Sequence, residues 1–259
     1  MAALLIFALL AACEKQQYND EADFTVIPTG EHTIIIQGYI GEKTAVSIPP
    51  RIQSMPVAEI MEDAFSGYWK ENRLVSLSIP NTVTVIGKSA FANNRLTELR
   101  LGRGVAIIEE NAFAYNQLTS LAIPNSVTYI GEVAFMENQL RRVAIGSGVA
   151  SIEGGVFMLN EITSVTLGRN VEFIGHSAFA FNQLASISIP ASVSVIEMFA
   201  FNDNPLTRIT IGENVDLGRF NPLTNEHEAA FPLEFDAFYF SQGRKAGTYT
   251  YTNGAWSVR

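Results

Sequence analysis

Residues 74–139 read LVSLSIPNTVTVIGKSAFANNR, LTELRLGRGVAIIEENAFAYNQ and LTSLAIPNSVTYIGEVAFMENQ, which are three consecutive copies of one 22-residue unit. Three further copies follow over residues 140–205 without an insertion. A fixed period of this length is typical of a solenoid, in which each unit forms one turn and packs on the next. One elongated domain therefore accounts for most of the chain.

Each unit carries two short apolar segments that predict strands. The first has the spacing L-x-x-L-x-L, as in Leu74, Leu77 and Ile79, and its alternating end places Leu77 and Ile79 on the inward face. The second ends in a column of isoleucines from Ile86 to Ile196, whose β-branched side chains favour an extended backbone. The repeat therefore predicts a parallel sheet and, beside it, a second row of short strands or irregular segments.

Two further columns close the unit. Small residues, alanine in every copy except for Val156, precede an invariant phenylalanine and predict one helical or 3-10 turn. The phenylalanines are Phe91, Phe113, Phe135, Phe157, Phe179 and Phe201. We interpret an asparagine column as a buried ladder that satisfies backbone groups of the adjacent turn, rather than as a ligand site. It consists of Asn94, Asn116, Asn138, Asn160, Asn182 and Asn204.

The repeats lie between two segments that we expect to cap the solenoid. Residues 24–44 contain two apolar runs separated by turn residues and form the predicted N-terminal cap. The solenoid is expected over residues 45–217, with a four-residue insertion in its first unit. Residues 218–259 form the predicted C-terminal cap, with a hairpin at the Asn253-Gly254 pair. The phenylalanine position is lost after Val215, so the Phe column is expected to end there.

The start of the chain is apolar up to Cys13, the single cysteine, and polar after it. The apolar run is too short to span a bilayer and suits a secretory signal peptide over residues 1–12. Residues 13–23 are then expected to form a flexible tether. The stretch Leu10-Ala11-Ala12-Cys13 resembles the lipobox of bacterial lipoproteins. The resemblance implies an exported protein whose Cys13 carries a lipid, and which touches the membrane through that anchor only, at the cell surface.

The repeat signature L-x-x-L-x-I-P-x-S-V-x-x-I-G-x-x-A-F-x-x-N resembles the BspA-type leucine-rich repeat family. Residues 118–135, LTSLAIPNSVTYIGEVAF, match it almost residue for residue, and about two-thirds of the chain is covered. The resemblance implies a β-dominated, right-handed leucine-rich-repeat solenoid. It also implies a bacterial surface or secreted protein, often an adhesin or host-matrix binder, with no catalytic residues to carry over.

Other features argue against nucleic-acid binding and against catalysis. The formal charge of -9 is spread over many short polar stretches, which disfavours a nucleic-acid surface. His32, His176 and His227 lie in unrelated contexts, so no metal site, cofactor or catalytic triad is expected. The segments Gly102-Arg-Gly104 and Gly146-Ser-Gly148 stand at a corner where another unit has Pro-Asn-Ser. We interpret their glycines as turn residues.

The outward positions of the first strand in each unit form the candidate face, which is mostly small and rich in hydroxyl groups. Small side chains leave room for a partner, although any soluble sheet face tolerates them. The candidate face consists of Ser76, Ser78, Glu98, Arg100, Ser120, Arg142, Ser164, Thr166, Ser186, Ser188, Arg208 and Thr210, with Ala122 and Ala144 between them.

A second column is apolar and could leave a hydrophobic stripe exposed, which would mark a partner site or a self-association edge. The stripe would consist of Val85, Ile107, Tyr129, Ser151, Phe173 and Val195, with Tyr115, Leu159 and Phe181.

These features favour a non-enzymatic surface protein that binds or adheres to a protein or glycan partner, such as host extracellular matrix. The alternative is a structural or assembly module of the bacterial envelope that contacts only other bacterial proteins. A hydrolase with an unrecognised site is a third hypothesis.

Overall fold

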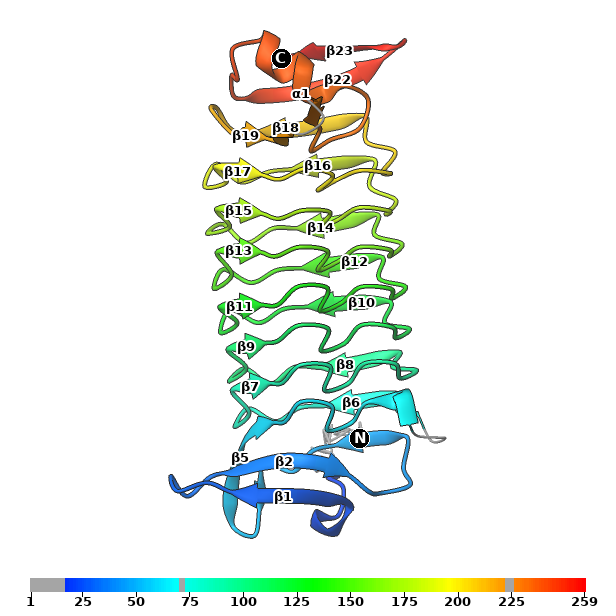
Figure 1. The fold of residues 1–259 in the computed structure, drawn as a ribbon, viewed down its shortest axis with the longest axis vertical. Coiled ribbons are helices and arrows are strands. Elements are labelled where there is room, and N and C mark those ends of the chain that lie inside the picture. Colours follow the sequence, from blue (N-terminus) through cyan, green and yellow to red (C-terminus); the bar gives the residue numbers. More distant parts are fainter. Residues whose placement is uncertain (1–16, 70–72, 222–225) are drawn as a thin grey trace, which may run out of the picture.

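The described part of the chain is an elongated stack of turns with a cap at each end (Figure 1). The computed structural model describes residues 17–69, 73–221 and 226–259. Two rows of short strands run along the stack, one on each side of it (Figure 1). This arrangement confirms the predicted solenoid with parallel sheets.

The first row contains strands of three or four residues, formed by the L-x-x-L-x-L segments. Neighbours that pair do so in parallel and place equivalent residues of successive turns opposite one another, so that Ser120 pairs with Arg142 and Arg142 with Ser164. The first row consists of β3 (Ala45–Ser47), β6 (Ser76–Ser78), β8 (Glu98–Arg100), β10 (Ser120–Ala122), β12 (Arg142–Ala144), β14 (Ser164–Thr166), β16 (Ser186–Ser188) and β18 (Arg208–Ile211).

The second row contains two-residue strands whose second residue is the buried isoleucine in all but the last, where it is Leu217. Their pairing is also parallel, with Ile152 opposite Ile174 and Ile174 opposite Ile196. The second row consists of β7 (Val85–Ile86), β9 (Ile107–Ile108), β11 (Tyr129–Ile130), β13 (Ser151–Ile152), β15 (Phe173–Ile174), β17 (Val195–Ile196) and β19 (Asp216–Leu217). The predicted second row is therefore made of true, though very short, strands.

A stack of buried phenylalanine rings runs through the core. The rings of Phe113, Phe135 and Phe157 are nearly parallel, with centroids 5.2 Å and 5.8 Å apart. All three side chains are fully buried. Such offset stacking adds to the free energy of burying each ring, so the invariant Phe column is explained by packing between turns.

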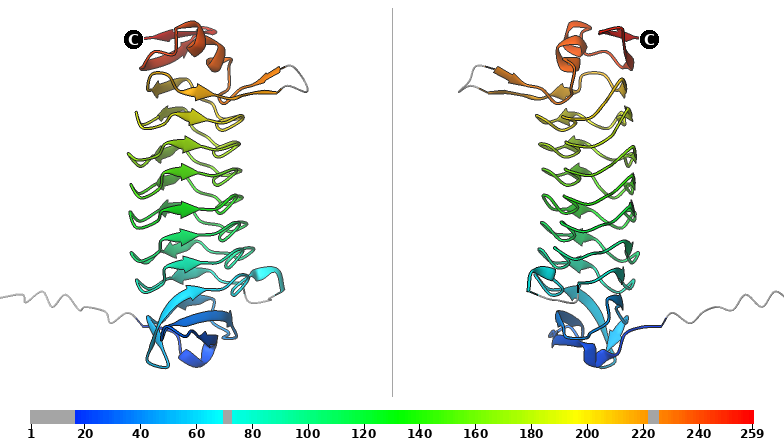
Figure 2. Two further views of the ribbon diagram at one scale, coloured as in Figure 1. Left: turned by 60° about the vertical axis from the view of Figure 1, so that its left-hand side comes forward. Right: turned by 90° about the vertical axis from the view of Figure 1, so that its right-hand side faces the viewer.

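The Phe stack continues beyond Phe201, and the prediction that it ends there is wrong. Phe231 lies on Phe201 with ring centroids 4.7 Å apart and planes only 8° apart. Between them, a hairpin formed by β20 (Arg219–Asn221) and β21 (Glu226–Glu228) projects from the stack (Figure 2). The insertion displaces the phenylalanine along the sequence but leaves its place in the core unchanged.

Two hydrogen-bonded turns flank the core phenylalanine of each repeat, one before it and one after it. They stand where a helical or 3-10 turn was predicted. In the repeat of residues 96–117 the Ala112 N–H donates to the Glu109 carbonyl and the Ala114 N–H to the Asn111 carbonyl, at 3.3 and 3.2 Å. Asn111 and Tyr115 have φ values of 61° and 58°. Equivalent residues of the other units are also left-handed, and this backbone costs about 1–2 kcal/mol for a residue other than glycine.

The N-terminal cap confirms the two predicted strands and ends the second row. Its β1 (Phe24–Pro28) and β2 (Ile34–Tyr39) are antiparallel, and β2 pairs in parallel with β5 (Met55–Ile60), which continues to β7. The cap also contains β4 (Arg51–Ile52) and the 3-10 helix η1 (Glu21–Asp23), and η2 (Gly67–Trp69) marks the insertion in the first unit.

Part of the segment predicted to be a tether is attached to this cap. Asn19 is buried, and its backbone N–H donates to the Ser47 carbonyl at 2.9 Å. In return, the Ser47 N–H donates to Asn19 Oδ1 at 2.9 Å, and Asn19 Nδ2 donates to the Tyr39 hydroxyl. Residues 17–23 therefore belong structurally with the cap, which begins before residue 24.

The C-terminal cap closes the first row with a hairpin, as predicted. Its β22 (Gly247–Thr252) pairs antiparallel with β18 on one side and with β23 (Ala255–Val258) on the other. Asn253 and Gly254 both have positive φ, as a type I′ turn requires. The aromatic segment before the hairpin forms α1 (Phe235–Ser241), which buries Phe235 and Tyr239 against the end of the core.

Candidate functional site

The structure brings the predicted candidate face together on the first row of strands. Its side chains point away from the core, whereas the intervening Leu77, Leu121, Val143, Ile187 and Ile209 are buried. The residues from Glu98 to Arg208 on this face are exposed.

The ends of the candidate face are half-buried because the caps cover them. The Thr210 hydroxyl lies 3.0 Å from that of Thr248 in the C-terminal hairpin. At the other end, Ser76 and Ser78 line a hollow of about 280 Å³ that residues 17–19 help to form. The accessible part of the face therefore runs from Glu98 in β8 to Arg208 at the start of β18.

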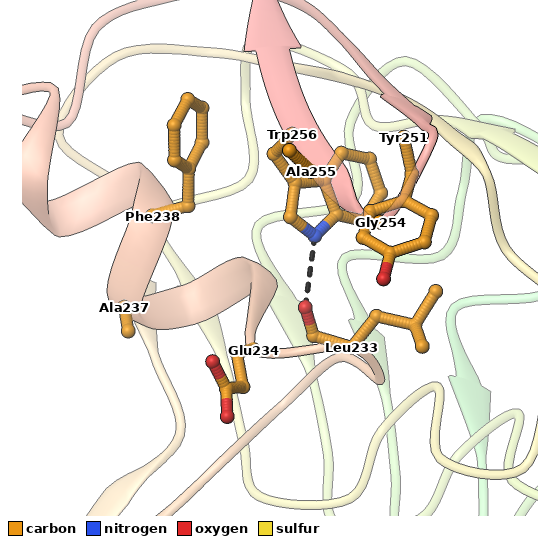
Figure 3. Close-up of a pocket in the computed structure, with 8 residues that line it drawn as sticks. All are labelled: Leu233, Glu234, Ala237, Phe238, Tyr251, Gly254, Ala255 and Trp256. Atoms are coloured by element: carbon orange, nitrogen blue, oxygen red, sulfur yellow. Dashed lines mark hydrogen bonds between the residues drawn. The ribbon is translucent and has the colours of Figure 1, made fainter.

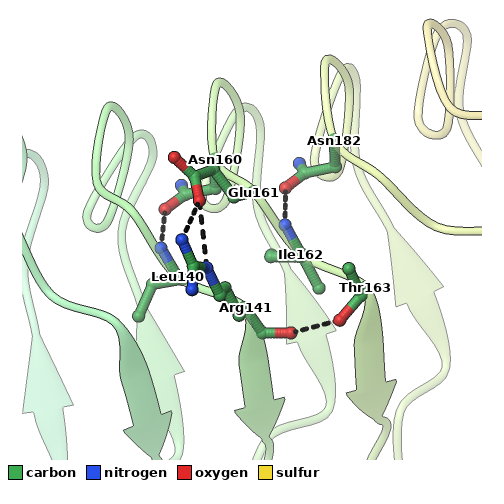
Figure 4. A network of polar contacts seen from close by, with 7 residues as sticks. All are labelled: Leu140, Arg141, Asn160, Glu161, Ile162, Thr163 and Asn182. Carbon is green, nitrogen blue, oxygen red and sulfur yellow. Dashed lines mark hydrogen bonds and ion pairs between the residues drawn. The ribbon is translucent and has the colours of Figure 1, made fainter.

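Three arginines stand out on this face, on which Glu98 is the one acidic residue. Within the described residues, Arg100, Arg142 and Arg208 form no ion pair or side-chain hydrogen bond. In contrast, Arg141, one residue before the strand, forms an ion pair with Glu161 of the next turn at 3.1 Å (Figure 4). The three face arginines therefore present donors to solvent.

The asparagine column forms the predicted ladder (Figure 4). Asn160 is buried, its Oδ1 accepts from the Leu140 N–H at 3.0 Å, and its Nδ2 donates to the carbonyls of Phe135 and Phe157 at 3.0 and 3.2 Å. Asn182 repeats this pattern one turn later with Ile162. These amides are occupied by backbone groups, so the column is structural.

A ladder of hydroxyl groups runs outside the first row and was not predicted from the sequence. Thr163 Oγ1 donates to the Arg141 carbonyl at 3.2 Å (Figure 4), and Thr97 and Thr207 do the same to Val75 and Ala185. The signal that could have revealed it is a recurring threonine directly after the first leucine of the unit.

The proposed apolar stripe is only partly exposed. Tyr129 is 46% exposed, and Phe181, at the corner after the Phe column, is 48% exposed. Tyr115 and Leu159 are exposed as well, whereas Ile107 and the other apolar first residues of the second-row strands are half-buried. Single exposed side chains are therefore present, but a continuous hydrophobic stripe along the second row is not.

The C-terminal cap contains a hollow of about 560 Å³ between α1 and the β22–β23 hairpin (Figure 3). Its walls are largely apolar and include Phe238, Tyr251 and Trp256, with Glu234 at one side. The Trp256 indole N–H donates to the Leu233 carbonyl at 2.9 Å and so joins the hairpin to the segment before the helix.

The histidines do not come together. His32 lies in the β1–β2 turn, His176 follows β15 and His227 belongs to β21. Across residues 17–69, 73–221 and 226–259, no group of three or more His, Cys, Asp or Glu residues is placed to hold a metal ion. None of the helices in these ranges is long and apolar enough to cross a membrane, and Cys13 lies outside them.

The corner glycines are explained by close approach of neighbouring turns. A Cβ atom on Gly102 would collide with the Pro80 carbonyl oxygen, and one on Gly146 would lie 2.6 Å from that of Pro124. These glycines therefore pack turn on turn and do not form a phosphate loop.

The repeat geometry agrees with the comparison to known families. The model described as BspA type Leucine rich repeat region matches residues 46–160 and 106–221, with six copies. The chain belongs to this BspA-type family. A comparison with curated proteins finds no match.

Two solved structures are similar to this BspA-type chain. The pneumococcal vaccine antigen PcpA is 19% identical, with a TM-score of 0.54, over 76% of this chain and 64% of that one. A leucine-rich repeat protein of T. pallidum is 23% identical, with a TM-score of 0.43, over 72% of this chain and 92% of that one. At these identities the likeness concerns the fold alone.

Proposed function

We propose that this BspA-type protein is a non-enzymatic surface protein that binds a protein or glycan partner through its candidate face. The observation that carries the proposal is the separation of roles along the first row. Inward side chains are buried in a repeating core, whereas the outward ones are exposed and differ between turns. Positions that vary without disturbing the core are where a solenoid acquires a specific partner.

The chemistry of the face suits a polar partner. Ala122 and Ala144 pair in register at its centre and leave a shallow floor beside Arg142. The guanidinium groups of Arg100 and Arg142 are open to carboxylates, sulfates or sugar hydroxyls, and arginine can bind a carboxylate with two parallel hydrogen bonds. Serine and threonine hydroxyls on the neighbouring strands supply both donors and acceptors.

The test is a binding screen of the purified chain against host-matrix proteins and a glycan array. Ala144→Trp would place a large ring on the centre of the face, and we expect it to weaken binding at least tenfold. Ala150→Trp is the matched control, because Ala150 is exposed but lies outside the candidate face. Equal affinities of the two variants would overturn the assignment of the face, and a flat response across the panel would favour the envelope assembly module.

A second pair of variants tests the charge on the face. Arg142→Ala and Arg95→Ala remove the same charge from exposed positions, but only Arg142 belongs to the candidate face. We expect the first to weaken binding to an anionic partner and the second to leave it unchanged. The reverse order would contradict the proposed site.

We also propose that the protein is exported and anchored by a lipid on Cys13. Support comes from the sequence, in which the apolar run ends at a lipobox-like Cys13 before a polar segment. Cells fed a radioactive fatty acid should label the protein, and Cys13→Ser should abolish both labelling and partition into detergent. An unlabelled protein that stays in the aqueous phase would refute the anchor without affecting the proposed binding face.

A further inference from the structure

One turn of the solenoid lacks two side chains that its neighbours possess. At Gly154 and Gly155 the other five copies carry larger residues, such as Glu132 and Val133 in the preceding unit and His176 and Ser177 in the following one. The missing side chains leave a recess of about 320 Å³ in the surface after the second row of strands. It shares no residue with the candidate face.

The floor of the recess is apolar. Val133, Met158 and Phe173 line it, and they come from three successive turns. Phe173 is half-buried, so part of its side chain remains accessible at the recess. A floor of this kind accommodates an alkyl chain.

The rim of the recess is acidic. Glu132, Glu153 and Glu197 line it. Two of these carboxylates are held in place. Ser151 Oγ donates to Glu153 Oε1 at 2.6 Å, and the backbone N–H of His176 donates to Glu197 Oε2 at 3.1 Å. No lysine or arginine is among the lining residues.

The surrounding surface strengthens this negative potential. The pKa of Tyr129, in β11, is raised first by burial and second by the nearby carboxylates of Glu153, Glu132, Glu109 and Glu110. The same side of the molecule thus carries acidic groups on several successive turns. A cation is attracted towards the recess before it makes contact.

The carboxylates do not converge on one point, which separates this site from a metal site. In the part of the chain that the structure describes, no three acidic or histidine groups are close enough together to coordinate an ion. Groups spread around an apolar floor match a long side chain that ends in a compact charge. Lysine has this shape, with a flexible alkyl stem and three rotatable donors, whereas arginine favours planar, bidentate partners.

We propose that the recess receives a lysine side chain presented by a partner protein. Its alkyl stem lies against Val133, Met158 and Phe173, and its ammonium group lies at the acidic rim to which Glu132, Glu153 and Glu197 contribute. The site is a second point of attachment on the side of the solenoid and is independent of the partner proposed for the first row of strands.

The recess can be filled without changing any charge. A Cβ atom on Gly154 would make only ordinary contacts, 3.6 Å from the His176 carbonyl oxygen and 3.8 Å from Glu132. The equivalent position of the sixth unit is Met198, so the turn accepts methionine. Gly154→Met should therefore fold normally and occupy the recess. Gly30→Met is the matched control, because Gly30 lies in an open turn of the N-terminal cap with nothing near its Cβ position.

The experiment measures the affinity of the chain for a fluorescent hexalysine peptide by anisotropy, with thermal melts to check each variant. We expect Gly154→Met to weaken binding at least tenfold and Glu153→Gln to weaken it several-fold. Gly30→Met and Glu31→Gln, which is on the N-terminal cap, should bind like the wild type. Acetylation of the lysines should abolish binding.

Undiminished binding of hexalysine by Gly154→Met would overturn the proposal, because attraction by the net charge alone would then explain the affinity. Absence of binding by the wild type would overturn it too. Tighter binding of hexa-arginine would refute the assignment to lysine. If Gly154→Met melts early, Glu153→Gln against Glu31→Gln decides the question. None of these outcomes depends on the partner of the candidate face.

Discussion

Replacement of Asn138 by alanine tests the asparagine ladder at the middle of the stack. The side chain is only 7% exposed and makes four hydrogen bonds to backbone groups. Its Oδ1 accepts from the Leu118 N–H at 3.0 Å. Its Nδ2 donates to the carbonyls of Phe113, Phe135 and Met136 at 3.0, 3.2 and 3.4 Å.

The four hydrogen bonds do not contribute equally. Each of the three carbonyls keeps another donor in the variant, because Asn116, Asn160 and the Tyr115 N–H also bind them. The buried Leu118 N–H has Asn138 as its acceptor and would be left without a partner. An unsatisfied buried donor costs about 1–3 kcal/mol, and the small cavity adds to that. We expect Asn138→Ala to lower the free energy of unfolding by about 2–4 kcal/mol.

The matched control is Asn125→Ala. Asn125 Oδ1 also accepts a backbone N–H of the next turn, from Ser147 at 2.9 Å, but the residue is exposed. Water can replace that bond, so we expect a loss below about 1 kcal/mol. Urea unfolding followed by circular dichroism measures both variants, with slopes compared because a repeat array can depart from two-state behaviour. Equal losses for the two variants would refute the ladder as a stabilising element.

Three further predictions concern the core. Phe135→Ala should lower the free energy of unfolding by about 3–5 kcal/mol because it leaves a gap in the ring stack. Phe181→Ala, at an exposed corner, should lower it by less than about 1 kcal/mol. A shift of only about one or two degrees in the melting temperature of Phe135→Ala would contradict the placement of Phe135 in the stack. Phe231→Ala should cost about 3–4 kcal/mol in the same assay if this residue belongs to the stack, and a surface-like loss would restore the view that the stack ends at Phe201. Asn138→Asp would place a carboxyl group among carbonyl oxygens, which raises the pKa of that carboxyl group in the folded state above its value in the unfolded state. The stability of the variant relative to the wild type should therefore fall as pH rises through the folded-state pKa and recover on acidification. A stability difference that does not change between pH 4 and pH 8 would contradict this prediction.

The repeating part of this molecule could be predicted residue by residue. Leu77 and Ile86 are buried where the alternation places them, and Phe135 stacks on the phenylalanines of both neighbouring turns. Asn138 binds the backbone of the adjacent turn, as its column indicates. These predictions succeed because equivalent residues of successive turns contact one another and are always 22 residues apart in the sequence.

The corners were harder to predict. Tyr115, Val133 and Phe181 adopt left-handed backbone although none of these residue types favours it. The packing of the whole turn imposes this conformation, because the chain must reverse direction on both sides of the buried phenylalanine. For these three residues no local preference in the sequence could reveal it, whereas Asn93, Asn111, Gly155 and Asp203, at equivalent positions, are residue types that favour positive φ.

The sequence by itself determined the stack of turns, its buried columns and its outward candidate face, since each depends on a separation of 22 residues that is visible in the printed chain. Only the tertiary structure decided the place of Phe231, which a hairpin insertion moves out of register while the core keeps a position for it. The recess at Gly154 and Gly155 is of the same kind, because the absence of two side chains becomes a site only through the walls that other turns supply. Contacts that repeat every turn can be predicted from a fixed sequence separation. The effect of the hairpin insertion and of the two missing side chains depends on which residues of other turns surround them, and only the tertiary structure shows that.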